Sequence, residues 1–267
     1  MFTERRRSAI LRVVQENGGA SVQELARLAD VSESTIRRDL NRLSGEGLLQ
    51  RVRGGGTGLA AGTDRSRERA GNGQFPEPDA VPFHEVAARS PSSKQRIAVA
   101  AAQLVNDGDV VVLDIGTTTA LIARALRGRP ITVITASVAV LDELRDEPAT
   151  ELVLLGGVLR RSYHSLVGSL TQDALRRLQA TVCFLGTSGV QADGTVMDST
   201  GTEVPVKRAI LSAAARAVLV ADETKFPGTG LLPVCPAESI QTLVTSTSTG
   251  GSSLEAFRLA GSELKQV

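Results

Sequence analysis

The chain has 267 residues, of which 42% are hydrophobic and only 3% aromatic. This length favours two domains, although one large α/β domain would also fit, and the core must be largely aliphatic. A net charge of +1 excludes indiscriminate binding to polyanions, so any nucleic-acid site has to be a local patch. The two cysteines, Cys183 and Cys235, have no CxxC or histidine spacing around them, which argues against a metal site and a disulfide scaffold.

The N-terminus is basic but has no apolar stretch of signal-peptide length. No later segment approaches the ~18 apolar residues that a membrane-spanning helix needs. We therefore expect a cytoplasmic protein without a membrane partner.

The first fifty residues predict a series of short helices. Apolar residues at helical spacing predict a helix over residues 4–17, which ends at Asn17-Gly18-Gly19. Ser21-Val22-Gln23-Glu24 has the sequence of a capping box, so a second helix should begin there. Ser32 is a good N-cap for a third helix, in which Ile36, Leu40 and Leu43 share one face. Two capped helices joined by a short turn are typical of a helix-turn-helix.

The third predicted helix has the composition of a DNA-reading helix. With Ile36 and Leu40 facing inward, its outward side chains are hydroxyls, arginines and an asparagine, which contact phosphates and base edges in the major groove. Residues 1–53 contain ten Arg against seven Asp and Glu, which makes this segment the local basic patch. The predicted DNA-binding residues are Ser21, Ser32, Ser34, Thr35, Arg37, Arg38, Asn41, Arg51 and Arg53.

A short β wing is expected after this helix. Residues 48–53 alternate between apolar and polar, and Gly54-Gly55-Gly56 breaks the pattern, which leaves Arg51 and Arg53 near the tip. An ordinary three-helix bundle with a solvated arginine face is the alternative interpretation.

Residues 57–82 are rich in Gly, contain three Pro and show no periodicity, as a linker does. The predicted domains are therefore residues 1–56, 57–82 and 83–267.

The C-terminal part alternates between apolar strands and helical patterns. Strands are predicted at residues 110–114, 131–135, 151–155, 181–186, 217–221 and 242–245, with helices between most of them. This spacing predicts an α/β, Rossmann-like fold with a largely parallel sheet and helices on its faces.

The loops that follow these strands share a composition suited to phosphate. Ligands of such folds bind beyond the carboxyl ends of the strands, where Gly admits an anion to the backbone and Thr or Ser donates to it. No Walker sequence or GxGxxG occurs, so we expect no nucleotide cofactor. The predicted effector-binding residues are Asp114, Gly116, Thr117, Thr118, Thr119, Thr135, Ser137, Gly156, Gly157, Gly186, Thr187, Gly189, Glu203 and Lys225.

Only four of the 30 basic residues are lysines, so each lysine is informative. Lys225 follows a predicted strand and is a natural point charge for a phosphate. Lys207 lies one helical turn after Glu203, where an ion pair between the two is the expected role. Lys94 could serve either purpose. His164 is expected to be an ordinary residue of a surface loop.

The string VSESTIRRDLNRLSGEGLLQRVRGGG resembles the signature of the DeoR family of bacterial regulators, with Arg53 and Gly56 where the family usually has His and Ala. LDIGTTT, VITAS, LLGGVLR, FLGTSGV and ADETKF resemble the effector domain of that family, whose fold is shared with sugar-phosphate isomerases, glucosamine-phosphate deaminases and acyl-CoA transferases. The resemblance implies a repressor of a carbohydrate or sugar-phosphate operon that binds operator DNA and a phosphorylated sugar. Because operator half-sites usually mirror protein symmetry, we expect at least a homodimer.

Two positions depart from the family pattern. Ala136 replaces an Asn, and Ser246 replaces an acidic residue, both in loops expected near the ligand. A regulator that no longer senses a ligand is therefore one alternative. A sugar-phosphate isomerase or deaminase fused to a DNA-binding domain is another, although Asp114, Glu203 and Asp222 do not form a catalytic loop of the isomerase kind.

Overall fold

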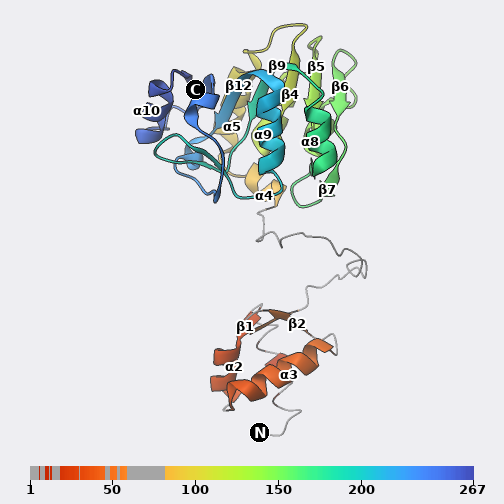
Figure 1. Cartoon of the computed structure of the whole chain (residues 1–267), viewed down its shortest axis with the longest axis vertical. Helices are drawn as coiled ribbons and strands as arrows, with labels where there is room; N and C mark the ends of the chain where they lie inside the picture. Colours follow the sequence, from red (N-terminus) through yellow and green to blue (C-terminus); the bar gives the residue numbers. More distant parts are fainter. Residues whose placement is uncertain are drawn as a thin grey trace. The chain divides into compact units, whose positions relative to one another are not determined.

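The computed structural model describes residues 6, 10, 11, 13, 19–29, 31–45, 49–52, 55–58 and 82–267. The chain divides into two units, Met1–Gln74 and Phe75–Val267, and each is described by itself (Figure 1). Among the described residues, no helix has both the length and the apolar character needed to cross a membrane. The predicted first helix lies mostly outside the described residues, but residues 6, 10, 11 and 13 are helical.

The N-terminal unit contains the predicted helix-turn-helix. The helices α2 (Val22–Ala29) and α3 (Glu33–Gly45) share a small core that includes Ile36, Leu40 and Leu43, all at most 2% exposed. The capping box before α2 is confirmed, because the Glu24 carboxylate accepts from the Ser21 backbone N–H at 2.9 Å. The N-cap of α3 is confirmed as well, since the Ser32 hydroxyl accepts from the Thr35 N–H at 3.3 Å.

The wing is a hairpin within a three-stranded antiparallel sheet. Its strands are β1 (Gly19–Ser21), β2 (Leu49–Val52) and β3 (Gly55–Gly58), in the order β1-β3-β2. Gly55 and Gly56 were expected to interrupt the strand, but they begin the returning strand β3. A strand without large side chains has no hydrophobic periodicity, and β3 is paired with a neighbour on both sides. The predicted limit at residue 56 therefore falls inside β3.

Seven parallel strands form the sheet of the C-terminal unit. In sequence order they are β4 (Val110–Leu113), β5 (Thr132–Thr135), β6 (Glu151–Leu154), β9 (Ala180–Leu185), β12 (Ala214–Ala221), β14 (Thr242–Thr245) and β15 (Glu263–Gln266). Their order in the sheet is β15-β14-β12-β9-β4-β5-β6, and every neighbouring pair is parallel. The chain first builds outward from β4 to β6 and then from β9 in the opposite direction. The topological switch point therefore lies between β4 and β9.

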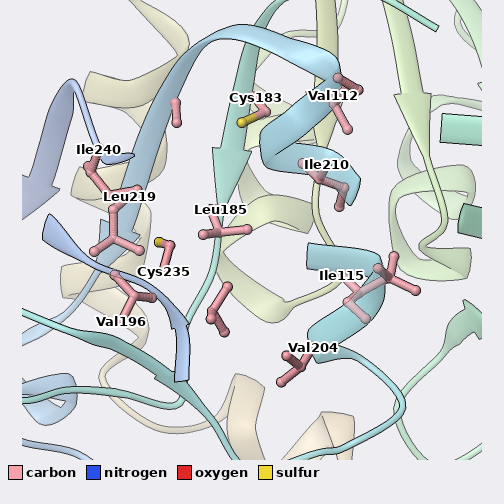
Figure 2. Packing of buried hydrophobic residues seen from close by; sticks show 14 of the residues in the cluster. Val112, Ile115, Cys183, Leu185, Val196, Val204, Ile210, Leu219, Cys235 and Ile240 are labelled. Carbon is pink, nitrogen blue, oxygen red and sulfur yellow. The ribbon is translucent and has the colours of Figure 1, made fainter. Parts of the chain in front are cut away.

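Helices cover both faces of this sheet and enclose one aliphatic core on each (Figure 1). One face carries α5 (Pro91–Ala102), α6 (Thr117–Ala125) and α7 (Val138–Leu144). The other carries α8 (Ser169–Leu175), α9 (Val204–Ala213) and α10 (Ser252–Leu259). Figure 2 shows Ile210 of α9 with Leu185 and Leu219 of the sheet in this second core. Alternate strand residues face opposite cores, as the continuously apolar strands indicated.

Several elements were not predicted. They are β1, α4 (Phe83–Ala87), the hairpin of β7 (Val158–Arg160) and β8 (Ser165–Val167), the antiparallel sheet of β10 (Gly189–Val190), β11 (Val196–Asp198) and β13 (Leu232–Cys235), and the 3-10 turns η1 (Glu223–Lys225) and η2 (Ala237–Ser239). The edge strand β15 was also missed, because its sequence ELKQ is mostly polar. β11 and η1 both matter for the site.

Candidate functional site

The outer face of α3 presents the side chains expected to read DNA. Ser34, Arg37, Arg38 and Asn41 are exposed, Thr35 is half-buried, and Ile36 and Leu40 are fully buried behind them. Arg42 is exposed on the same helix and was missed, although it lies one turn after Arg38. The geometry is that of a helix with one polar face available to a DNA groove.

Intramolecular contacts engage some of these residues. Glu33 forms an ion pair with Arg37 at 2.8 Å, one turn apart on α3. On the inner face, Asp39 forms an ion pair with Arg6 at 2.7 Å, and both side chains are largely buried. The Ser21 and Ser32 hydroxyls cap helices, and any contact of theirs with DNA stays a prediction. Arg51 lies in β2, whereas Arg53 lies outside the described residues.

A cavity of about 120 Å³ opens at the carboxyl ends of β4, β9 and β12 in the C-terminal unit. We call it the switch-point cavity, since it lies where the sheet order reverses. Of the residues predicted to bind an effector, it is lined by Gly116, Thr117, Thr118, Thr119, Gly186, Thr187, Glu203 and Lys225. These residues come from the first turn of α6 and its N-cap, from the loop after β9, from the N-cap of α9 and from η1.

The remaining predicted residues do not line the cavity. Thr135 donates its hydroxyl to the Leu113 carbonyl at 2.8 Å, and Ser137 is the N-cap of α7. A side chain at Gly157 would collide with Thr171, and one at Gly189 would collide with the backbone of Pro227. Asp114 is absent from the cavity lining. Thr135 ends β5, and Ser137, Gly156 and Gly157 follow β5 and β6, which lie on the other side of β4 from β9. The parallel strands end at the same edge of the sheet, but this cavity opens only at the ends of β4, β9 and β12.

Lys207, which lines the cavity, belongs to a buried ion pair. The Lys207 ammonium donates to Asp114, and it also bonds the Gly186 carbonyl at 3.0 Å and lies 3.5 Å from an Asp198 carboxylate oxygen. Burial opposes the charge of Lys207, but these carboxylates outweigh it and raise the pKa of the ammonium. The expected pair between Lys207 and Glu203 is therefore wrong. Lys207 points inward from α9 to the switch point.

Glu203, which also lines the cavity, has a different partner. Its carboxylate forms an ion pair with Arg160 of β7 and accepts from the Ser165 hydroxyl at 3.3 Å. Both members of the ion pair are less than 10% exposed. Burial raises the pKa of Glu203 to about 7, and the neighbouring Asp198 adds to this effect. A carboxyl group that titrates near neutrality thus borders the cavity.

Two lysines and a carboxylate form another part of the cavity wall. Lys94 of α5 donates its ammonium to the Val86 carbonyl, and burial lowers its pKa to about 8 against the opposing charge of Asp222. Burial also lowers the pKa of Lys225. One Asp222 oxygen accepts from the Thr224 N–H, while the other is buried and has no hydrogen-bond partner within the described part of the chain. The wall therefore has positive charge and an unused acceptor.

Sequence reasoning missed several lining residues. Asp198 ends β11, a short strand with no clear periodicity, and Tyr163 lies in the turn between β7 and β8. Val86 and Arg89 come from α4 and the turn after it, next to a segment that was assigned to the linker. The candidates were chosen because they follow predicted strands of the main sheet. None of these positions does, so this criterion could not identify them.

Comparisons with known proteins agree with both units. The DeoR-like helix-turn-helix domain matches residues 6–59, and the DeoR C terminal sensor domain matches residues 89–247. The HTH-type transcriptional regulator GolR of Listeria innocua is 29% identical over 266 residues, which cover 99% of each chain. The glycerol-3-phosphate regulon repressor of Escherichia coli is 30% identical over 85% of this chain and 84% of its own, and the L-fucose operon activator of Haemophilus influenzae is 30% identical over 90% of each.

Solved structures show a weaker likeness. Ribose 5-phosphate isomerase A of Methanocaldococcus jannaschii is 21% identical with a TM-score of 0.39, over 51% of this chain and 54% of its own. We transfer no activity from a similarity at this level. The helix-turn-helix, the sensor-domain match and the full-length relatives together show that the chain belongs to the DeoR family of DNA-binding transcription regulators.

Proposed function

We propose that this chain represses a carbohydrate or sugar-phosphate operon and is controlled by a phosphorylated sugar bound in the switch-point cavity. The observation that carries the proposal is the polarity of the cavity. Lysines, hydroxyls and buried carboxylates all line it, which suits a molecule with both a phosphate and hydroxyl groups. The relative named as a glycerol-3-phosphate regulon repressor supports a phosphorylated ligand, and the relative named as an L-fucose operon activator supports a sugar.

The phosphate would bind at the N-terminus of α6, within reach of lysine charge. Gly116 is the N-cap of this helix and has no capping side chain, so backbone N–H groups point to the cavity end. Thr119 uses its hydroxyl to donate to the carbonyls of Asp114 and Gly116. Direct contact therefore falls to Thr117 and Thr118, with Lys94 or Lys225 as the counter-charge.

The sugar hydroxyls would bind to the carboxylates. The free oxygen of Asp222 is a buried acceptor without a donor among the described residues, and a hydroxyl group of the ligand would supply one. Glu203 offers a second acceptor, although Arg160 already engages it. A ligand with a phosphate and no hydroxyl groups should therefore bind more weakly than a phosphosugar.

The two departures from the family pattern do not border the cavity. Ala136 is buried in the core between the sheet and α8 and α9. Ser246 is fully buried, and its hydroxyl bonds to Glu223 and Thr249. Because neither residue lines the cavity, this favours an effector-responsive regulator over one that has lost its ligand.

The test is a thermal-shift panel of phosphosugars on the full chain, followed by operator binding with and without the best compound. A ligand at 100 times its Kd should stabilise the protein by about 2.7 kcal/mol through mass action. Lys225→Met should reduce the shift, whereas the control Lys265→Met on β15, distant in sequence and absent from the cavity lining, should not. If no phosphosugar shifts the melting temperature at millimolar concentration, the proposed ligand class is wrong.

One observation supports an enzymatic alternative. Glu203 borders the cavity and has a pKa of about 7, as a general base or acid would need. We nevertheless propose that the chain is not an enzyme, because the Arg160 ion pair engages this carboxylate. Turnover of ribose 5-phosphate or glucosamine 6-phosphate that is lost in Glu203→Gln would reverse that choice.

We also propose that the chain binds its operator as at least a homodimer. Repressors of this kind usually read two half-sites with two copies of the recognition helix. Light scattering of the full chain, with and without operator DNA, would measure the assembly state. A monomer in both conditions would contradict the proposal.

A further inference from the structure

We infer that effector binding stabilises the packing of α4, which we call the strap, against the switch-point cavity. The strap would thereby transmit the occupancy of the cavity to the segment by which the chain enters the C-terminal unit from the N-terminal unit. This inference rests on the proposed effector site. The described part of the C-terminal unit begins at residue 82, directly before α4. Any change that the effector imposes on α4 therefore acts on the first described residues of the C-terminal unit.

The strap forms part of the cavity wall. Val86, on α4, and Arg89, just after it, both line the cavity. α4 is only five residues long and none of them is buried, so its own core contacts are few. A helix this short is not stable by itself, and contacts with its neighbours must hold it.

The first such contact comes from the cavity wall. The Lys94 ammonium donates to the Val86 carbonyl, near the end of α4, and Lys94 itself lines the cavity. An ammonium group has three donors, so Lys94 can keep this bond and still donate to a phosphate. A bound phosphate would stabilise the charged form of Lys94 and would therefore strengthen its hold on α4.

The second contact holds the other end of the strap. The Phe83 ring stacks on His164 at 5.1 Å between ring centroids and meets Tyr163 edge-on at 5.9 Å. The Phe83 N–H donates to the Ser162 carbonyl at 2.9 Å. Tyr163 lines the cavity and lies 5.8 Å below the Arg160 guanidinium, which pairs with Glu203. Both ends of α4 are thus tied to residues that border the cavity.

Backbone strain is found at the same place. In the part of the chain that the structure describes, Ser90 and His164 are the two non-glycine residues with positive φ, at 45° and 53°. Ser90 lies just after the strap and bonds Glu223 at 3.1 Å, and His164 stacks on Phe83. Residues held in this region are strained and need surrounding contacts to persist. Because strained residues flank the strap in sequence or contact it, α4 is suited to adopt two conformations.

Hydrogen–deuterium exchange on the full chain tests the inference. The probes are inorganic phosphate and the phosphosugars of the thermal-shift panel. We expect a probe that slows exchange in residues 116–119 to slow it several-fold in residues 83–89 as well. Slower exchange in residues 116–119 with no change in residues 83–89 would overturn the strap and leave the proposed function standing. If no probe protects residues 116–119, the proposed function fails, and this inference fails with it.

A variant outside the cavity distinguishes an effect transmitted through the strap from protection by direct contact with the ligand. Phe83 does not line the cavity, so Phe83→Leu removes the ring contacts and leaves the binding groups in place. Because coupling between sites is reciprocal, the affinity for the probe should fall about 5-fold or more, and operator binding should stop responding to the probe. Glu85→Gln, an exposed change on the same helix, is the control and should behave like the wild type. Equal probe affinity and an unchanged operator response in Phe83→Leu would overturn the inference. If that variant folds poorly, the exchange experiment on the wild-type chain still tests it.

Discussion

Lys207 on α9 forms its ion pair with Asp114 at the end of β4, 93 residues earlier in the chain. Both side chains are at most 2% exposed. Asp114 also accepts from the Gly186 N–H at 2.9 Å, and Lys207 donates to the carbonyl of the same residue. The two charges thus tie the loop after β4 to the loop after β9. The ion pair therefore fixes the relative positions of these two loops, and both loops contribute residues to the cavity lining.

Lys207→Met should destabilise the C-terminal unit, because it leaves the Asp114 carboxylate buried without its counter-charge. Removing one partner of a buried pair typically costs about 3–5 kcal/mol. The measurement is urea unfolding of the full chain, with Lys265→Met as a surface control expected within about ±0.5 kcal/mol. The double change Asp114→Asn with Lys207→Met should recover part of the loss. If Lys207→Met matches the control, the ion pair does not organise the switch point.

Arg38→Ala should weaken operator binding. Arg38 is exposed on the polar face of α3, and no ion pair of this side chain is seen among the described residues. Loss of a bidentate contact with a base should cost about 1–3 kcal/mol. Fluorescence anisotropy with operator DNA at fixed salt measures the change, and Arg177→Ala on the C-terminal unit is the matched arginine control. Unchanged affinity would remove Arg38 from the reading residues.

Glu33→Gln should have the opposite effect on operator binding. Glu33 holds the Arg37 side chain in the free protein, and its own charge would face the phosphates of bound DNA. Neutralising it frees Arg37 and removes a repulsion, so the affinity should rise and the rise should shrink as salt increases. The pair is exposed, so stability should change little. Weaker binding in this variant would mean that Glu33 positions Arg37 for the DNA.

The sequence predicted best what depends on neighbouring residues. Ile36, Leu40 and Leu43 are one helical turn apart, and the caps at Ser21 and Ser32 are built from bonds within three residues, so the helix-turn-helix could be located. All six strands predicted for the main sheet are present for a similar reason, since each is a short apolar run.

The features that the sequence could not predict depend on contacts between residues far apart in the chain. The loops after β5 and β9 look alike, and only the sheet order places one beside the cavity and the other away from it. The partner of Lys207 was misassigned because a residue one turn away is visible in the sequence and a residue 93 positions away is not. Asp198 lies on β11, whose pairing with β10 and β13 has no alternating pattern to reveal it.

Effector affinity should fall as the pH rises through about 8. Burial lowers the pKa of Lys94 to about 8, so this ammonium loses its proton well below the usual range of lysine. The phosphate of a sugar is already a dianion above pH 7, so the ligand does not change charge in this window. Titration calorimetry at pH 7 and pH 9, using the phosphosugar with the largest thermal shift, measures the effect. Lys94→Met should bind more weakly at pH 7 and show a smaller pH dependence, whereas Lys265→Met should keep that of the wild type. Glu203, with a pKa of about 7, and Lys225, whose pKa burial lowers, account for the part that remains in Lys94→Met. A wild-type affinity that is constant between these pH values would show that the charge of Lys94 does not contribute to binding.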